Sequence, residues 1–461
     1  MNSKPEAMRS SKMPLKAKTD LEMNLVLTKD ETADVLGEEF AQARKRLPGA
    51  GKVAQFRQQA FDAFAAAGLP HRRIEDWKYT DLRALMRKVW PLAPAPDDEA
   101  LSRAASMVEA HAISGARQLV LVDGVFVQTL SDLGGLENGV RIRSLREVLE
   151  GKNALLERLL FAPKDQAVVA LNAAMMTDGV VIELAEGASL DRPIHLLHVA
   201  TSRRPVSIFS RSLVEIGQKA RATLVESYVS EEANSYQVND TLLLSVADDA
   251  RLDHIRLVEE SSDASNISSS FVTLGARAHL NAFGLTAGGA VSRYQTAITC
   301  AGEGSRIESS GVNLLKGRQH ADTTLLLDHA VPHCSSREVF RAVVDDRAHS
   351  VFQGRIIVRP KAQKTDARMM TRALLLSDEA EADNKPELEI FADDVTCGHG
   401  ATAGALDEQL LFYLRARGLS EREAQALLVQ AFVGEAIEEI ADEALRDIAL
   451  ASAARWLSRR G

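Results

Sequence analysis

A short motif recurs through the middle of this sequence: a small residue, any residue, and then an apolar residue. It is found at Ala188–Leu190, Ala222–Leu224, Ala250–Leu252, Ala278–Leu280 and Ser305–Ile307. The last residues of successive motifs are 34, 28, 28 and 27 positions apart, and helical periodicity is nearly absent until about Gly404. Because one rung cannot bury its apolar face alone, this spacing predicts the stacked rungs of a β-solenoid. A β-sandwich is the second interpretation, and after Ile307 the spacing becomes less regular.

Helical patterns lie on both sides of the repeat. From Val53 to Ala67 the apolar residues share one face, and Gly68 ends the helix. A hairpin is expected around Asp123 and Gly124, followed by a helical insertion at about residues 145–176. Near the C-terminus, Ser420 and Glu423 form a capping box, and one helical stripe holds Ala424, Leu427, Leu428, Ala431 and Phe432. We therefore expect a mainly β protein whose core is capped by helices.

Composition excludes several functional classes. The 461 residues carry a formal charge of −9, which argues against general binding of nucleic acid. Three cysteines are too few for a disulfide framework and indicate a reducing, cytoplasmic location. The sequence has no membrane-length apolar run and no secretory signal, and residues 1–25 are expected to be a flexible tail.

Catalytic and nucleotide-binding motifs are missing. Pro48–Lys52 resembles part of a phosphate loop, but Arg46 and Val53 stand where that motif requires glycine and serine or threonine. GxSxG, HExxH and CxxC patterns do not occur. The sequence therefore predicts a protein that is not itself an ATPase, and no catalytic residue is assigned.

The best candidate metal ligands are Cys397 and His399. A thiolate and an imidazole two residues apart, in a stretch of small residues expected to be a loop, suit iron, zinc or an iron–sulfur cluster. Asp393 and Asp394 could supply oxygen ligands or orient His399. The alternative is a buried cysteine beside a histidine that caps the next helix, and the residues alone leave the two interpretations even.

Other candidate groups carry less weight. His320, His329, His333 and His349 lie close in sequence to Cys334, and Asp328–His329 and His333–Cys334 remain possible metal ligands. Each of these histidines is more simply explained by a local hydrogen bond. Near the N-terminus, Glu75, Trp77 and Tyr79 lie in a charged segment. We interpret it as an attachment of the N-terminal domain in preference to a recognition surface.

Three stretches carry a resemblance to a known family: Glu75–Thr80, Lys385–Asp394 with Cys397–Thr402, and Leu411–Ser420. They resemble the SufB/SufD family, subunits of the SUF machinery for iron–sulfur cluster assembly. The resemblance implies a right-handed parallel β-helix flanked by helical regions. The expected segments are a tail (1–25), an N-terminal helical domain (26–115), a β-helix core (116–392) and a C-terminal helical domain (393–461).

The resemblance also implies partners. The core would pair with SufB, and two copies of the ATPase SufC would serve each pair. SufC would dock on the C-terminal helices, at Leu410, Leu411, Phe412, Tyr413, Arg417, Gly418, Leu428 and Phe432. His399, with Cys397, would lie at the SufB interface, where iron or a nascent cluster is held transiently and no cofactor is bound stably by this chain alone. Met370–Leu375 lacks the cysteine expected of a SufB subunit, which indicates the SufD side of the family.

Two alternatives from other functional classes remain. One is a carbohydrate-active lyase or esterase on a β-helix, with a site drawn from Asp322, Asp328, Arg337 and Arg341. The low aromatic content, 5%, and the cysteine usage argue against it. The other is a self-sufficient metal-binding homodimer in which each chain donates His399.

Overall fold

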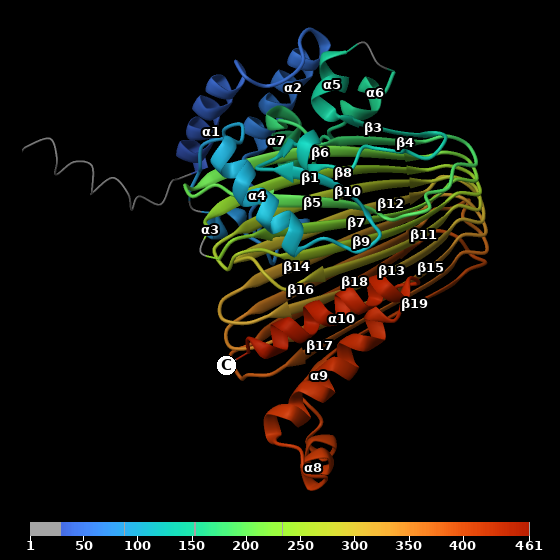
Figure 1. Ribbon diagram of the computed structural model, residues 1–461. Helices are drawn as coiled ribbons and strands as arrows, with labels where there is room; N and C mark the ends of the chain where they lie inside the picture. Colours follow the sequence, from blue (N-terminus) through green and yellow to red (C-terminus); the bar gives the residue numbers. More distant parts are fainter. Residues whose placement is uncertain (1–28, 87, 152–153, 233, 461) are drawn as a thin grey trace, which may run out of the picture.

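The computed structural model describes residues 29–460 except 87, 152–153 and 233. The chain forms a long parallel β-solenoid with helices around its N-terminal end and further helices beside and beyond its C-terminal end (Figure 1). The predicted mainly β solenoid with flanking helices is confirmed. The expected tail at residues 1–25 lies outside the described residues.

Helices occupy three parts of the chain. The N-terminal set comprises α1 (Lys29–Ala43), α2 (Lys52–Ala67), η3 (Glu75–Trp77), α3 (Leu82–Leu85) and α4 (Asp98–Ala110). An insertion among the first strands contains η4 (Gln128–Leu130), α5 (Leu145–Glu150), α6 (Leu156–Leu159) and α7 (Ala167–Met175). The C-terminal set is α8 (Glu408–Ala416), α9 (Glu421–Ile437) and α10 (Glu443–Ser458). The expected stop at Gly68 is confirmed, with a φ of 70° that favours glycine, and so is the capping box at Ser420.

Strands alternate between two sheets as the chain winds. One sheet contains β1 (Arg117–Val122), β2 (Val125–Phe126), β5 (Ile194–Ala200), β7 (Arg221–Ser230), β9 (Arg251–Glu259), β11 (His279–Thr286), β13 (Arg306–Leu315), β15 (Ser335–Val344), β17 (Asp366–Leu375) and β19 (Thr396–Gly404). The other contains β3 (Val140–Ser144), β4 (Val180–Leu184), β6 (Val206–Ile216), β8 (Tyr236–Val246), β10 (Ser265–Leu274), β12 (Val291–Cys300), β14 (His320–His329), β16 (His349–Val358) and β18 (Glu381–Ile390). Within the described part of the chain two strand pairs are antiparallel, the predicted β1–β2 hairpin and β3–β4.

The register shows what the sequence repeat encodes. Equivalent positions on successive rungs form columns, and one column runs Ala222, Leu252, Leu280, Ile307, Ser336, Ala367 and Cys397. Leu252, Leu280 and Ile307 stack as predicted. The motif at Ala222–Leu224 was misaligned by two residues, because Ala222 and not Leu224 pairs with Leu252. The regularity also continues beyond Ile307, where a weaker repeat was expected.

The turns that lead into β7, β9, β11, β13, β15 and β17 share one construction. A residue with left-handed backbone precedes a small, fully buried residue. The pairs are Lys219–Ala220, Asp249–Ala250, Arg277–Ala278, Gly304–Ser305, His333–Cys334 and Lys364–Thr365. The small residue allows the turn to fold down onto the interior, which explains why the motif begins with alanine or serine.

Different helices cover different faces of the solenoid. The main apolar core lies between the two sheets. Helix α7 packs on the outer face of β6 and β8, and α2 packs on α7. Helices α9 and α10 pack on the outer face of the odd-numbered sheet (Figure 1). Strand pairing continues to Gly404, beyond the expected core boundary at 392, although the division into domains itself stays a prediction. No helix in the described ranges is long and apolar enough to cross a lipid bilayer.

Candidate functional site at the open end of the solenoid

The last rung of the solenoid is exposed. It consists of β18, the turn at residues 391–395, and β19, and we call it the open end. Most β18 residues are half-buried and most β19 residues are exposed. The inner strands of the same two sheets, such as β8 and β7, are mostly buried. Both strands are the outermost members of their sheets. One edge of each therefore offers backbone N–H and C=O groups to another chain.

Cys397 and His399 lie on β19 in the structure, so their expected position on a loop is wrong. The backbone of this small-residue stretch is held by pairing with β17, which turns it into a strand. Cys397 ends the column that begins at Ala222 and packs against the main core. Burial raises the pKa of its thiol. Strand side chains alternate between faces, so His399 shares the inward face with Cys397 but is exposed at the rim.

The column below His399 contains an unusual acid. His399 pairs with Met369, which in turn pairs with Glu338 on β15. Glu338 is 1% exposed, neither carboxylate oxygen has a hydrogen-bond partner among the described residues, and burial raises its pKa to about 8. The stretch Met370–Leu375, compared above with the cysteine-bearing strand of SufB, is part of β17 and lies directly beside β19.

Asp393 and Asp394 lie in the turn between β18 and β19. Asp394 forms an ion pair with Lys364, and its backbone N–H donates to Gln363 Oε1 at 2.9 Å. Among the described residues, neither aspartate makes a hydrogen bond or ion pair with His399. Their expected role as supporting ligands therefore stays a prediction.

The residues expected to dock SufC fall into two groups. Leu410, Phe412 and Tyr413 on α8 are exposed, with Phe412 at 74%, and α8 projects away from the solenoid body (Figure 1). Leu411 is half-buried, Arg417 lies over the Tyr413 ring at 5.0 Å, and Gly418 adopts a φ of 96° at the turn.

The two expected docking residues on α9, Leu428 and Phe432, also contribute to packing within the chain. Phe432 packs against the solenoid and lies under Arg341 at 5.6 Å, and Leu428 is half-buried. The predicted α9 stripe was also partly wrong, because Leu427 and Ala431 are exposed while Val429 and Val433 are buried.

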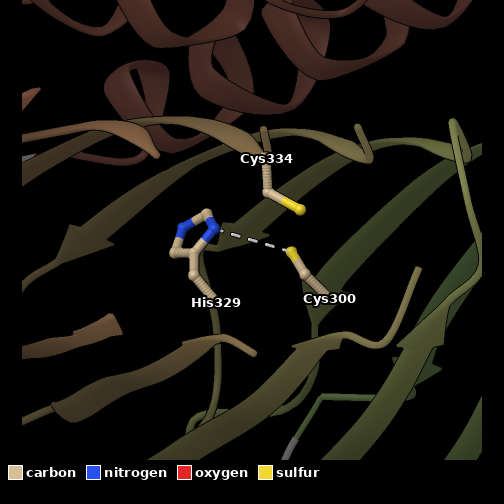
Figure 2. A group of neighbouring side chains, drawn as sticks. All are labelled: Cys300, His329 and Cys334. Carbon is tan, nitrogen blue, oxygen red and sulfur yellow. Dashed lines mark hydrogen bonds between the residues drawn. The ribbon is translucent and has the colours of Figure 1, made fainter. Parts of the chain in front are cut away.

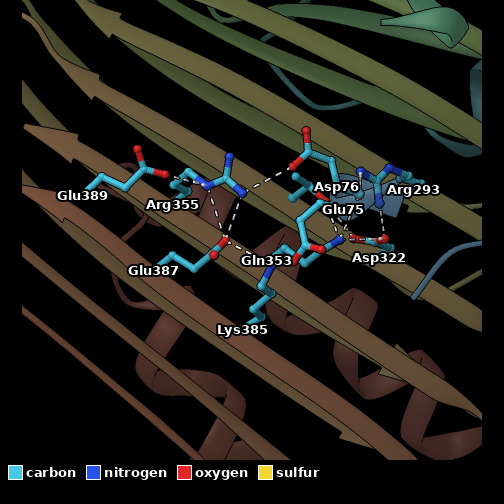
Figure 3. A network of polar contacts seen from close by, with 10 residues as sticks. Glu75, Asp76, Arg293, Asp322, Gln353, Arg355, Lys385, Glu387 and Glu389 are labelled. Carbon is cyan, nitrogen blue, oxygen red and sulfur yellow. Dashed lines mark hydrogen bonds and ion pairs between the residues drawn. The ribbon is translucent and has the colours of Figure 1, made fainter. Parts of the chain in front are cut away.

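Residues 75–86, here called the strap, attach the N-terminal domain to late strands (Figure 3). Trp77 is buried beneath the Arg293 guanidinium, 3.8 Å from the ring centroid, and Arg293 also donates to Asp76 O at 2.8 Å. Glu75 pairs with Lys385 on β18. Tyr79 is half-buried. The strap therefore makes long-range structural contacts, the most distant of them to β18, 310 residues further along the chain. The preference for an attachment over a recognition surface stays a prediction.

The structure brings together one group that the sequence reasoning did not assemble. Cys300, His329 and Cys334 offer ligand atoms that all lie within 4.8 Å of one another (Figure 2). His329 and Cys334 were weak candidates separately, and Cys300 was not considered. The solenoid repeat could have identified this group, because Cys300 and His329 are one rung apart and pair directly.

The other candidate histidines are hydrogen-bonded to other side chains or exposed. His320 Nε2 lies 2.9 Å from Thr80 Oγ1, His349 Nε2 lies 2.8 Å from Asp383 Oδ2, and His333 is exposed in a turn. The four residues considered for a carbohydrate-active site each form an ion pair with a different partner. Asp322 pairs with Arg293, Asp328 with Arg359, Arg337 with Asp366 and Arg341 with Glu435.

Comparison with known proteins covers nearly the whole described chain. The family described as "SUF system FeS cluster assembly, SufBD core domain" matches residues 198–432, and "SufBD protein N-terminal region" matches residues 40–196. The iron–sulfur cluster assembly protein SufD of Escherichia coli is 30% identical over 414 residues, 89% of this chain and 93% of that protein. An iron–sulfur cluster assembly SufBD family protein of Synechocystis is 32% identical over 398 residues, 83% of this chain and 86% of its own length.

Proposed function

This chain belongs to the SufBD family of the SUF iron–sulfur cluster assembly system, with SufD-like relatives, and we propose that it is a non-ATPase scaffold subunit that pairs with SufB and docks SufC. Pairing would use the open end, and docking would use α8 with the start of α9. The observation that carries the proposal is the uncovered last rung, which holds His399 at its rim.

The two edge strands differ in how they discourage pairing. β18 contains Lys385 and Pro386 with flanking glutamates, which are devices that protect a sheet edge. β19 reads TCGHGATAG and contains no proline and no lysine, arginine, aspartate or glutamate. An exposed strand without such protection favours addition of a strand from a partner. SufB is the proposed partner, and a second copy of this chain is the alternative.

A contact through β19 would bring partner side chains beside His399 and Cys397. Iron or a nascent cluster is the cargo of the pathway, and the two residues offer an imidazole and a thiol toward it. The described residues place no third ligand with them, so we propose that the site is completed by SufB. His399 would then contribute to assembly without making this subunit an enzyme.

The docking of SufC rests on α8. A helix whose exposed apolar side chains include Leu410, Phe412 and Tyr413 presents the aromatic and aliphatic anchors typical of a helix that enters a groove. α8 makes its principal contacts with α9, so the solenoid does not cover this surface. The nucleotide chemistry would belong to SufC, in the cytoplasm.

The test is co-expression of this chain with SufB and SufC, followed by mass measurement of the purified assembly. Thr402→Lys adds a charge to the edge of β19 and should reduce SufB capture at least tenfold while SufC still binds. Phe412→Asp should have the reverse effect. Gln128→Lys, an exposed change at the other end of the solenoid, and Leu450→Asp, an exposed change on α10, are the matched controls.

Each outcome has a distinct meaning. Undiminished capture of SufB by Thr402→Lys excludes pairing through β19, and undiminished capture of SufC by Phe412→Asp excludes docking through α8. A homodimer that Thr402→Lys dissociates, without any SufB binding, supports the alternative. His399→Ala should leave the assembly intact but lower the yield of cluster formed on it.

A further inference from the structure

Cys300, His329 and Cys334, here called the buried triad, lie at one edge of the solenoid interior (Figure 2). Cys300 ends β12, His329 ends β14 directly beside it, and Cys334 follows the next turn. The three residues are at most 1% exposed. The solenoid register itself creates this proximity, because it stacks two strand ends and folds the following turn over them.

Cys334 occupies a special position in the repeat. It is the small buried turn residue, equivalent to Ala250, Ala278 and Ser305 on earlier rungs. Those residues place a methyl or hydroxyl group at this position, whereas Cys334 places a sulfur atom there. Its Sγ lies 3.2 Å from Ser305 Oγ and near the carbonyl oxygens of Gly302 and Pro332, at 3.6 and 3.5 Å.

The histidine of the triad is oriented by a partner of its own. His329 Nε2 lies 3.1 Å from Ser336 Oγ, and Nδ1 lies 3.7 Å from Cys300 Sγ. When Nε2–H donates to the serine hydroxyl, the lone pair of Nδ1 is directed toward the sulfur atoms. A hydrogen bond to the remote nitrogen is the usual way in which proteins fix the tautomer of a metal-binding histidine.

The chemistry of the triad is selective. Two thiols and an imidazole are the ligands preferred by thiophilic metal ions and unsuited to magnesium or calcium. A divalent ion bound to two thiolates forms a neutral unit, so its burial in an apolar core avoids the cost of an isolated charge. Each ligating thiol would lose its proton to solvent on binding. Ser305 and the Gly302 carbonyl lie close enough to the sulfur atoms to supply a fourth ligand after a small shift.

We propose that the buried triad is a binding site for a single thiophilic divalent metal ion, of the zinc class, within this chain. The site is separate from the open end, requires no residue of a partner, and does not depend on the pairing proposed above. Entry would require movement of the turns at residues 301–305 and 330–333, which flank the triad in sequence and contain the exposed residues Glu303 and His333.

The first test uses the wild-type chain with Zn²⁺ and Co²⁺ as probes. Protein treated with EDTA under anaerobic, reducing conditions should take up one equivalent of Co²⁺ with thiolate-to-cobalt charge-transfer absorption, and Zn²⁺ should displace it. X-ray absorption of the zinc form should show two sulfur ligands and a histidine nitrogen per ion. This measurement needs no variant and so cannot be confused with misfolding.

Variants then locate the site. Cys300→Ser and Cys334→Ser should abolish the charge-transfer band, and Ser336→Ala should weaken Co²⁺ binding about tenfold or more through His329. Cys397→Ser is the matched control, since it removes the remaining cysteine of the chain at the open end. Circular dichroism and thermal melting of each variant check its fold.

Three results would overturn the proposal. The first is absence of Co²⁺ or Zn²⁺ uptake by folded, fully reduced protein. The second is uptake lost in Cys397→Ser but kept in folded Cys300→Ser and Cys334→Ser, which assigns the metal to the open end. The third is a zinc spectrum dominated by oxygen ligands.

Discussion

The two ends of the solenoid are built from the same kind of rung but finish differently. At the N-terminal, closed end, antiparallel strands β2 and β3 terminate the sheets, and helix α5 packs against β3 and β4. At the open end, most residues of β18 are only half-buried and most residues of β19 are exposed. A solenoid needs caps at its ends, so the proposed pairing would cover the end that the described residues leave exposed.

The largest loss of stability is expected from breaking the contact between the strap and the solenoid. Arg293→Met removes the cation that pairs with Asp322 inside the strap contact, where both side chains are at most 1% exposed. Leaving a buried carboxylate unpaired should lower the free energy of unfolding by about 3–5 kcal/mol. Chemical denaturation measures this loss. Arg277→Met, which breaks an exposed pair with Asp249, is the matched control and should cost less than about 1 kcal/mol.

Hydrogen exchange makes the same variant informative about the two ends. Amides of β16 and β18 should lose protection before those of β4 and β6, because the strap contacts the later strands. Uniform loss along the solenoid would show that the ends unfold as one unit and would remove the distinction drawn between them.

A matched pair of leucines measures the difference in packing directly. Leu196 on β5 is fully buried near the closed end, and Leu388 on β18 is half-buried at the open end. Leu196→Ala should cost about 3 kcal/mol and Leu388→Ala about 1 kcal/mol, because a cavity forms only where surrounding atoms are fixed. Equal costs, measured by denaturation of the isolated chain, would mean that the open end is as well packed as the closed one.

The third prediction concerns pH and the column beneath His399. The pKa of Glu338 in the folded chain, about 8, is above the ordinary value of about 4.3, so folding favours its protonated form. The wild type should therefore lose stability as pH rises from about 5 to 8, and Glu338→Gln should remove that loss. The stability gained by the variant should be absent near pH 4.5 and should grow as the pH rises to 8, in melting experiments across this range.

Glu435 provides a control of opposite sign. Its hydrogen bond to Arg341 holds its pKa below the ordinary range, so its contribution is present above about pH 4.5 and lost in acid. Glu435→Gln should lower stability at neutral pH. If both variants shift the melting temperature in the same direction, burial does not set the protonation of Glu338.

Much of the fold could be predicted because the repeat is local in sequence. Leu252, Leu280 and Ile307 revealed the register, since each turn buries a small residue and then an apolar one. The error at Ala222–Leu224 arose because two overlapping small-x-apolar patterns occur there, and only the packing of Ala220 selects between them. Cys397 and His399 were expected on a loop because glycine, alanine and threonine do not indicate a strand, whereas tertiary pairing with β17 overrides that preference.

The candidate sites were less predictable than the fold. His399 and α8 were identified through motifs, but their exposure could not be read from the residues. Cys300 and Cys334 are 34 residues apart, and a metal site of that kind has no local spacing to recognise. In the sequence Glu338 is indistinguishable from an exposed polar strand residue. Its burial becomes clear only when the strand register places it on the inward face of the sheet.

The strap has a mechanical consequence. It contacts residues of β12, β14, β16 and β18, which are neighbours in one sheet, so its contacts extend about 15 Å along the solenoid axis at the usual strand separation. Twisting one rung relative to the next must strain these hydrogen bonds and ion pairs. This part of the solenoid therefore behaves as a torsionally stiff rod, and a torque applied at the C-terminal helices turns it together with the N-terminal helices.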